Sequence, residues 1–401
     1  MTSLLVLAAI VVGCSAALAV AWRAVRRRNV DRWLGAAILQ PMRTHRLDPQ
    51  AMTHVLLCVA DHYEPRWAGA DTDEARARVA AWTDGYEDAL GAFRDSDGRP
   101  PRHTFFYPID QYEPEHVDAI AGLCRRGYGE IEIHLHHDLD TAENLTRTLR
   151  EFTELFALRH GALGRWPDGR PAYGFVHGNW ASDNSRPDGR WCGVNDELSV
   201  LLRTGCYADF TLPSAPDATQ TRIVNAIYRA RGRAGCCKSH EHGMRVGHGT
   251  GTADGLMIVQ GPLRWWWPRG SRTVRIENAC IQAGQVPSMA RLAQWLRAGV
   301  RVRSRPDWLF VKLHTHGAVE ANREVLLGQA GRRFHAALAQ KAQGDARFRY
   351  HYVTAREMYN LARAAECGWQ GTVADALDFE VAPPPVGAFA DVPGVVRNSA
   401  E

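Results

Sequence analysis

A regular alternation of short apolar runs with helical patterns is the feature that most constrains how this chain can fold. Helical periodicity over Asp73–Phe93, Pro114–Arg126 and Thr141–His160 separates runs that have the length and composition of buried strands. Strands that alternate with helices pair in parallel, so the pattern predicts a parallel α/β sheet or a (β/α) barrel. The predicted strands are His54–Ala60, Thr104–Tyr107, Glu130–His136, Tyr173–His177, Tyr207–Thr211, Leu256–Gln260 and Leu309–His314.

The composition is that of a folded, weakly charged protein. Of the 401 residues, 45% are hydrophobic, which excludes a disordered chain and allows one large domain or two smaller ones. The 48 Lys and Arg residues against 44 Asp and Glu leave a net charge of +4, too weak to indicate nucleic-acid binding. The nine cysteines are odd in number and form no C-x-x-C pair, which argues against a disulfide framework or a zinc ribbon.

The amino-terminal segment predicts a membrane anchor. Leu4–Ala21 is an apolar run long enough to span a bilayer, and a cluster of arginines from Arg23 to Arg32 follows it. A cleavable signal carries its charges before the apolar run, so we expect an uncleaved single-pass helix in a bacterial inner membrane. The positive-inside rule places the catalytic domain on the cytoplasmic face, and a signal anchor facing outward is the alternative.

These patterns divide the chain into four parts. Residues 1–28 are the predicted transmembrane anchor with its basic flank, and residues 29–52 are a juxtamembrane linker. Residues 53–375 form the predicted barrel. Residues 376–401, with little periodicity and three consecutive prolines, are predicted to be a loosely ordered tail.

Residue types that bind metals or transfer protons follow four of the predicted strands. Asp61 and His62 end the first, His177 ends the fourth, and the last carries His314 and His316. In α/β folds the carboxyl ends of parallel strands meet at one edge, where sites are built. One histidine at a strand end is usually structural, but agreement among four strands favours a metal or acid–base site.

The segment from Glu130 to Asp138 is the densest of the four. At a period of two, His134 and His136 share one face of the strand with Glu130 and Glu132, while the intervening residues are apolar. Two histidines on one face can point at the same ion. His137 and Asp138 then turn into the following loop, so which residues complete a ligand set stays open.

The order of these motifs resembles that of the polysaccharide deacetylase (NodB homology, carbohydrate esterase family 4-like) superfamily over roughly residues 53–320. Its members have a strand ending in T-F-D-D, then H-[ST]-x-x-H, then R-x-P-Y, and a late strand ending in L-H. In this chain Val59–His62, His134–Asp138, Tyr173–Trp180 and Lys312–His314 occupy these places. The resemblance implies a distorted (β/α)7 barrel.

Residue by residue, the resemblance implies that Asp61 is the catalytic base and that His62 and His134 are metal ligands. The family's second ligand histidine is replaced by Asp138, so His136, His137 or Asp138 would complete the set. An offset by one, with Asp61 as ligand and no base, is an alternative. His314 matches the family's general acid, with His316 as a second candidate, and the third motif's arginine has no counterpart.

Such a site hydrolyses an amide. A divalent ion polarises the carbonyl and lowers the pKa of a bound water to about 7. A carboxylate such as Asp61 takes the proton of that water, and His314 or His316 protonates the departing amine. The nitrogen and oxygen ligands favour Zn²⁺ but discriminate poorly against Co²⁺, Mn²⁺ and Ni²⁺.

The loop after the fourth strand is a candidate substrate site. Besides His177, it carries groups suited to a sugar, namely Asn179, Trp180, Asp183 and Arg186. An ordinary polar surface loop with Asx turns is the alternative.

We therefore predict a membrane-anchored, metal-dependent deacetylase that acts on an N-acetylated sugar of a glycan or lipid-linked precursor. Another metal-dependent amidohydrolase or phosphoesterase is the enzymatic alternative. The other alternative is an inactive barrel that binds a glycan, because the family's second histidine and its arginine are missing.

Overall fold

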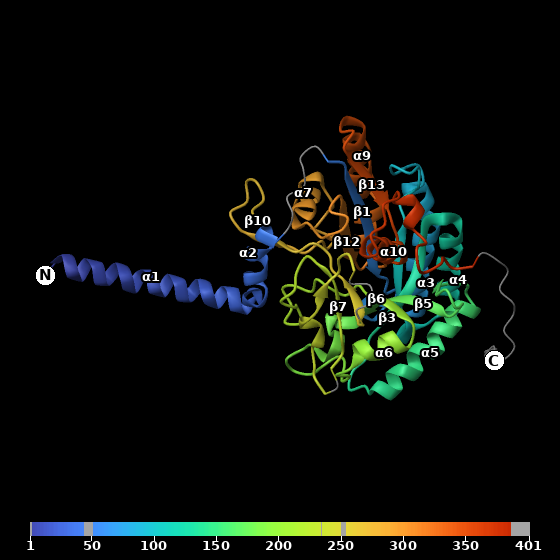
Figure 1. The fold of residues 1–401 in the computed structure, drawn as a ribbon, viewed down its shortest axis with the longest axis horizontal. Helices are drawn as coiled ribbons and strands as arrows, with labels where there is room; N and C mark the ends of the chain where they lie inside the picture. Colours follow the sequence, from blue (N-terminus) through green and yellow to red (C-terminus); the bar gives the residue numbers. More distant parts are fainter. Residues whose placement is uncertain (1, 44–50, 234, 250–253, 386–401) are drawn as a thin grey trace.

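The computed structural model describes residues 2–43, 51–233, 235–249 and 254–385 and shows a mixed α/β protein around a largely parallel sheet (Figure 1). The helices are α1 (Thr2–Arg27), α2 (Leu34–Arg43), α3 (Thr72–Leu90), α4 (Pro114–Leu123), α5 (Ala142–Leu158), α6 (Glu197–Arg203), α7 (Met289–Ala298), α8 (Glu320–Leu327), α9 (Gln329–Gly344) and α10 (Ala355–Glu366). The strands are β1 (Thr53–His62), β2 (His103–Pro108), β3 (Gly129–Leu135), β4 (Gly164–Arg165), β5 (Pro171–His177), β6 (Cys206–Asp209), β7 (Ile227–Ala230), β8 (Met244–Arg245), β9 (Leu256–Val259), β10 (Arg264–Trp266), β11 (Arg275–Glu277), β12 (Trp308–Thr315) and β13 (Phe348–Tyr352).

The main sheet follows the order β12-β1-β2-β3-β5-β6-β9-β7-β8. Every pair from β12 to β9 is parallel, whereas β7 and β8 add to β9 as antiparallel strands. β13 pairs with β1 in parallel, and β4 pairs with β5 in antiparallel orientation. The prediction of an α/β fold with a parallel sheet is therefore confirmed.

The two ends of the parallel part of the sheet approach each other. Lys312 of β12 donates through Nζ to the carbonyl of Phe210, just beyond β6, at 2.6 Å. Gly261, just beyond β9, lies so near β12 that a Cβ atom there would stand 2.4 Å from the carbonyl oxygen of Lys312. The sheet is therefore curled in a way that is compatible with a barrel. In the described part of the chain no ladder joins β9 to β12.

Both faces of the sheet are covered, which explains the unbroken apolar runs of its strands. Along β1, Leu56 and Cys58 pack on one side, while Val55 and Leu57 pack on the other. Helices α3, α4 and α5 cover the outer face of the neighbouring strands (Figure 1). The ring of Trp82 in α3 packs there against Phe105.

Helix α10 is buried along almost its whole length at the amino-terminal ends of the strands. Its first residues are tied to β3: Arg356 forms an ion pair with Glu130 at 2.8 Å, and Thr354 donates to the same carboxylate. The carbonyl of the fully buried Val381 accepts hydrogen bonds from Arg356 and Asn360. Residues 377–381 of the predicted tail therefore pack against α10, and residues 386–401 lie outside the described residues.

The predicted membrane anchor needs correction. The segment forms α1, which extends away from the domain (Figure 1). Among the residues that the structure describes, however, no helix combines the length and the apolar character needed to cross a membrane. The predictions of a single-pass transmembrane helix and of a bacterial inner-membrane location with a cytoplasmic catalytic domain are therefore wrong. The prediction rested on the length of the apolar run, but α1, which contains this run, is not apolar enough over the length that a membrane span needs.

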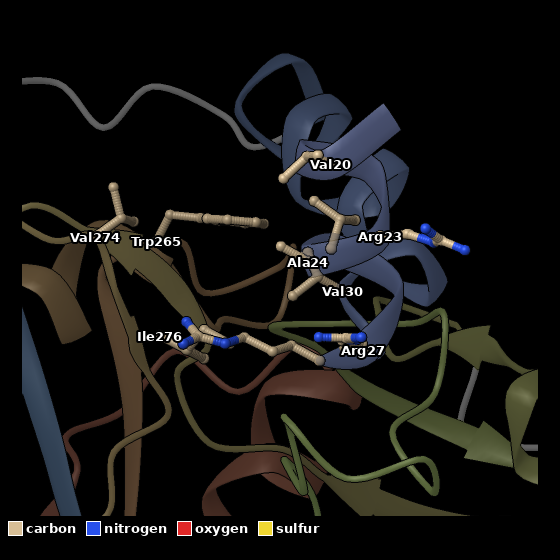
Figure 2. A pocket seen from close by; sticks show the side chains of 10 residues that line it. Val20, Arg23, Ala24, Arg27, Val30, Trp265, Val274 and Ile276 are labelled. Carbon is tan, nitrogen blue, oxygen red and sulfur yellow. The ribbon is translucent and has the colours of Figure 1, made fainter. Parts of the chain in front are cut away.

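The carboxyl-terminal end of α1 and the segment after it pack on the domain. Trp33 is fully buried with Ala215 and Leu263, and its ring lies 5.3 Å from that of Trp265 in β10. A cavity of about 650 Å³ lies between α1 and the β10–β11 hairpin (Figure 2). Trp265 thus packs against the segment that follows α1. Residues 44–50 of the predicted linker lie outside the described residues.

Candidate functional site

The carboxyl ends of β1, β3 and β12 bring histidines together, because parallel strands end at one edge of the sheet. His62 is the last residue of β1, and its ring centroid lies 5.1 Å from that of His134 in β3. The ring of His314 in β12 lies 6.4 Å from His62, and that of His316, just beyond β12, lies 4.9 Å away. The structure thus unites residues from three of the four strand ends that the sequence singled out.

A buried carboxylate, Glu64, stands among these rings. Its Oε1 lies 2.8 Å from Nε2 of His136 and 3.5 Å from Nε2 of His134. Its Oε2 accepts a hydrogen bond from Nδ1 of His316 at 2.6 Å. We refer to Glu64, His62, His134, His136, His314 and His316 as the Glu64 cluster.

Several ring nitrogens of the Glu64 cluster have no hydrogen-bond partner. Nδ1 of His134 lies 2.8 Å from the carbonyl of Val176. A carbonyl can only accept, so the proton is on Nδ1, and Nε2 presents a lone pair toward Glu64. Among the described residues, Nε2 of His62, Nε2 of His134 and Nδ1 of His314 are buried without a partner. Three such nitrogens close together leave the cluster free to bind water or an ion.

The surroundings shift the pKa values of this cluster in opposite directions. Burial acts to raise the pKa of Glu64, but the neighbouring His134, His136 and His316 hold it well below its usual value. Burial lowers the pKa of His62 and of His314, so both rings are neutral. Burial also opposes charge on His136, but its bonds to Asp110 and Glu64 raise its pKa to about 9.

The donor set suits a divalent metal ion. His134, His136 and Glu64 offer ligand atoms within 4.8 Å of one another. Nδ1 of His136 lies 3.2 Å from a carboxylate oxygen of Asp110, the arrangement by which proteins commonly orient a ligand histidine. Neutral nitrogen donors with one carboxylate are typical of zinc sites that keep a position for water. The residues present therefore fit the metal that the sequence predicted.

Two tryptophans stand beside this cluster. The ring of Trp67 lies 4.7 Å from that of His316 and is 42% exposed. The half-buried ring of Trp180 lies 6.2 Å from His62 and 6.3 Å from His316. Two aromatic surfaces next to a polar centre can accommodate the apolar face of a sugar ring. Of the predicted substrate loop, Trp180 is the residue placed at this centre.

Asp61 lies apart from the Glu64 cluster. Because successive side chains of a strand point to opposite faces, Asp61 faces away from His62. It is fully buried, lies 2.8 Å from Nε2 of His103, and accepts a 2.6 Å hydrogen bond from the backbone N–H of Gly317. This carboxylate therefore holds the turn directly after His316 and does not reach the other histidines.

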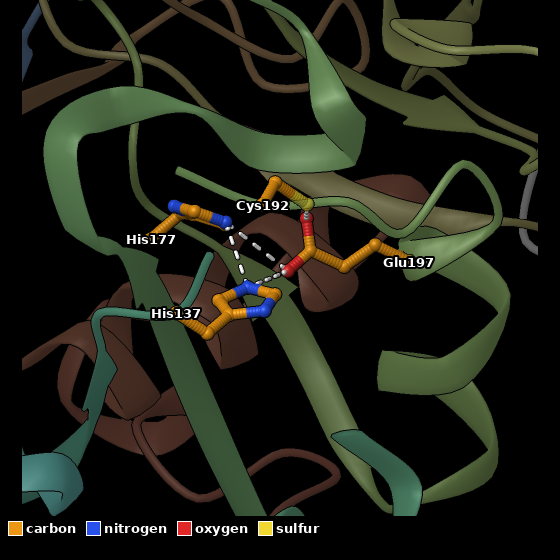
Figure 3. A group of neighbouring side chains, drawn as sticks. All are labelled: His137, His177, Cys192 and Glu197. Carbon is orange, nitrogen blue, oxygen red and sulfur yellow. Dashed lines mark hydrogen bonds and ion pairs between the residues drawn. The ribbon is translucent and has the colours of Figure 1, made fainter. Parts of the chain in front are cut away.

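His137 and His177 belong to a second group. They converge with Cys192 and Glu197, and the four offer ligand atoms that all lie within 4.8 Å of one another (Figure 3). Burial opposes charge on His137, but bonds to Asp140, Cys192 and Glu197 raise its pKa to about 12. Burial lowers the pKa of His177 to about 4. We refer to these four residues as the Cys192 cluster.

The remaining predicted site residues support the loop that carries them. Asp138 is exposed and accepts from the backbone N–H of Trp191 at 2.7 Å. Asp183 is fully buried and accepts from the backbone N–H of Ser239 at 2.5 Å. Arg186 pairs with Asp188 and lies 4.1 Å above the ring of Trp191, while Asn179 is exposed. The structure gives these residues local partners and brings none of them into the Glu64 cluster.

Sequence reasoning missed Glu64, Asp110, Cys192 and Glu197. A signal existed for Glu64, because it follows His62 by two residues and therefore continues the same face of an extended chain. The other three come from loops or a helix start, where strand periodicity gives no signal.

Gly178 is required beside the Glu64 cluster, because a Cβ atom there would lie 2.4 Å from the ring of His136.

No protein-family model and no curated protein matches the sequence. Among solved structures, a protein from Mycobacterium smegmatis assigned as a polysaccharide deacetylase is 13% identical, with a TM-score of 0.40, over 80% of this chain and 94% of the other. An alpha-mannosidase from Enterococcus faecalis V583 is also 13% identical, with a TM-score of 0.39, over 78% of this chain and 29% of the other. Similarity this distant assigns no role to any residue, so the function is argued from the site.

Proposed function

We propose that this protein is a metal-dependent carbohydrate deacetylase of the (β/α)7 barrel type, which removes the acetyl group from an N-acetylated sugar of a glycan, free or lipid-linked. The observation that carries the proposal is the buried Glu64 carboxylate among His134, His136 and His316, next to ring nitrogens without partners. A carboxylate beside imidazole lone pairs repels them unless a cation lies between them. A divalent ion held by Glu64, His134 and His136 would satisfy the carboxylate and the Nε2 lone pair of His134 together.

His134, His136 and Glu64 would hold the ion, and Zn²⁺ is the ion we favour for this donor set. When bound, it polarises the substrate carbonyl and lowers the pKa of water. Asp110 fixes the orientation of the His136 ring, and the Val176 carbonyl fixes the tautomer of His134. Both rings are thus oriented before a metal arrives, and the ion would displace the proton that His136 directs at Glu64.

The protein's other groups provide the proton transfers. His62, neutral and with a free Nε2, takes the proton of the attacking water, a role that Asp61 is too far from the cluster to fill. His62 then passes this proton to the departing amine. His316 donates its Nδ1 proton to Glu64, and this bond holds its ring 4.9 Å from that of His62. Asp61 acts as a positioning residue, because it anchors the turn after His316 through Gly317. His314, buried behind His62, completes the polar wall.

The substrate class follows from the surroundings of the cluster. Trp67 and Trp180 offer faces on which a sugar ring can stack while its acetamido group reaches the histidines. A flat apolar face with polar edges is what distinguishes a sugar from a peptide amide. The products are acetate and a free amino sugar.

The test uses the full-length protein with N-acetylglucosamine oligomers as the probe. We expect acetate release that depends on added Zn²⁺ or Co²⁺ and that His134→Ala abolishes. His116→Ala is the matched control, because His116 is also buried but bonds to Tyr107 outside the cluster. Acetate release that persists in His134→Ala, or its absence from the metal-loaded unmodified protein, would overturn the proposal. Phosphate release from sugar phosphates would point instead to the phosphoesterase alternative.

A further inference from the structure

The Cys192 cluster draws four potential ligands from four separate places in the fold (Figure 3). His137 follows β3, His177 ends β5, Cys192 lies in the loop after β5, and Glu197 begins α6. Three of them, His177, Cys192 and Glu197, are completely buried. Burying a carboxylate between two imidazoles in the core is costly unless a cation compensates its charge.

The hydrogen bonds around the cluster fix both imidazole tautomers. Nδ1 of His177 lies 2.5 Å from the carbonyl of Gly178, and Nδ1 of His137 lies 3.0 Å from a carboxylate oxygen of Asp140. Both partners are acceptors, so each Nδ1 carries a proton and each Nε2 is directed inward. The two Nε2 atoms face each other at 2.9 Å, and Oε1 of Glu197 lies 3.1 Å from one and 3.4 Å from the other. Three nitrogen and oxygen atoms at these distances need a proton or a metal ion between them.

We propose that His137, His177, Cys192 and Glu197 bind a second metal ion, a structural Zn²⁺, separate from the Glu64 cluster. In a tetrahedral zinc site the ligand atoms stand roughly 3.3 Å apart, or about 3.6 Å where one is sulfur. The separations of 2.9, 3.1 and 3.4 Å between nitrogen and oxygen atoms are close to these edges. Sγ of Cys192 lies 3.8 Å from Oε2 of Glu197, on the same side of the cluster.

The site is closed and therefore structural. Protein atoms supply all four ligand positions, and each histidine has an outer acceptor in Asp140 or Gly178, the arrangement that orients metal ligands in proteins. Metal binding converts the Cys192 thiol to a thiolate, and the proton goes to solvent. The ion would tie the loop of residues 178–197 to the ends of β3 and β5. That loop carries Trp180, so the second site positions one wall of the first.

A proton held between the two Nε2 atoms is the competing occupant. A proton satisfies the histidines and Glu197 but leaves Cys192 as a thiol. The distinguishing feature is therefore sulfur coordination, because the Glu64 cluster contains no cysteine. This difference also separates the present inference from the proposed function, since each can fail while the other stands.

Cobalt substitution of the full-length protein is the test. We expect Co²⁺ to give a thiolate-to-cobalt charge-transfer band in the near ultraviolet, at one thiolate per chain. Cys192→Ser should remove the band, whereas His134→Ala should keep it. Cys236→Ser/Cys237→Ser is the control for adventitious binding, because both of these thiols are exposed, and it should also keep the band.

X-ray absorption of the zinc-loaded unmodified protein gives a test that needs no variant, in case Cys192→Ser does not fold. We expect a sulfur scatterer at about 2.3 Å, alongside nitrogen and oxygen at about 2.0–2.1 Å. A spectrum with nitrogen and oxygen alone, or a cobalt band that survives undiminished in a folded Cys192→Ser variant, would overturn the inference.

Discussion

The two clusters at the carboxyl ends of the strands use the same residue types in opposite ways. The Glu64 cluster has more histidines than one ion needs, leaves ring nitrogens without partners and adjoins two tryptophans, one of them 42% exposed. The Cys192 cluster has four potential ligands and is almost completely enclosed. An open donor set can bind substrate and water, whereas a closed one can only hold the fold. The comparison teaches that the number of unsatisfied donors, more than the number of histidines, distinguishes a reactive site from a structural one.

The largest effect is expected from the carboxylate of the open cluster. Glu64→Gln keeps the shape but removes the charge that His134, His136 and His316 share, so deacetylase activity should fall by about 10²–10⁴-fold. Acetate release at saturating Zn²⁺ measures this loss, and thermal unfolding of the same sample checks the fold. Activity within threefold of the unmodified protein would show that Glu64 is not central.

Loss of a ligand from the Cys192 cluster should lower the free energy of unfolding more than it lowers activity. Cys192→Ser removes the sulfur ligand, and the free energy of unfolding should fall by roughly 3 kcal/mol or more, as for other losses of a structural metal. Urea denaturation measures the change, and a chelator should lower the stability of the unmodified protein by a similar amount. His134→Ala should lose activity with a smaller change in stability. Equal stability losses in both variants would erase the distinction between the clusters.

The ion pairs of Glu357 with arginines, outside both clusters, provide a reference for the effect of acid on stability. Burial acts to raise the pKa of Glu357, but Arg102, Arg99 and Arg356 hold it at about 2. Because the folded pKa lies below the ordinary value of 4.5, this stabilisation is complete above about pH 4.5 and is lost as the pH falls toward 2. The ion pairs of Glu357 thus contribute roughly 3 kcal/mol to the free energy of unfolding at neutral pH.

Denaturation of the metal-free protein between pH 7 and pH 2 measures this contribution. Glu357→Gln should flatten the acid limb of that profile. An unchanged profile in the variant would refute the assignment to this carboxylate. Losses of stability at milder pH in the metal-loaded protein then report on the two clusters and not on this ion pair.

A residue that only orients a ligand should have a smaller effect. Asp110→Asn weakens the hold on Nδ1 of His136 and should reduce metal affinity at the Glu64 cluster by about 10–100-fold. Competition with a chelating dye measures the affinity. Asp118→Asn is the matched control, because Asp118 bonds to a histidine, His160, outside both clusters. Equal changes in the two variants would mean that Asp110 has no specific role.

The smallest effect is expected at the substrate wall. Trp180→Ala removes a stacking surface and leaves every proposed ligand in place, so KM should rise by about tenfold with little change in kcat. Kinetics with N-acetylglucosamine oligomers of increasing length measure it. Trp369→Ala serves as the control, because Trp369 packs against Phe379 away from the site. A fall in kcat with unchanged KM would place Trp180 in the chemistry instead.

The sequence predicted the parallel strands from β12 to β9 and the end of the sheet where histidines meet, because both follow from local periodicity. It did not predict β7 or β13. His62, His134 and His314 come together as a result of parallel pairing, which fixes where each strand ends. The partners of these residues were not predictable in the same way. Cys192 and Glu197 return to β3 through a loop whose path depends on buried bonds such as that between Asp183 and Ser239. The strand-end position of His137 likewise gave no sign of which cluster it would join.

In the amino-terminal segment, composition predicted the secondary structure but not its relation to a membrane. Apolar composition predicted helix α1 correctly as a helix. The further step to a membrane-spanning helix was wrong, because no helix in the described residues is both long and apolar enough to cross a membrane.

The central claim is that this chain binds two ions, one at each cluster, and the metal content of the full-length protein tests it most directly. After reconstitution with Zn²⁺ and removal of loosely bound ions, we expect two equivalents per chain. One equivalent should remain in His134→Ala and one in Cys192→Ser. Less than about a tenth of an equivalent in the folded, unmodified protein would contradict the account at both sites.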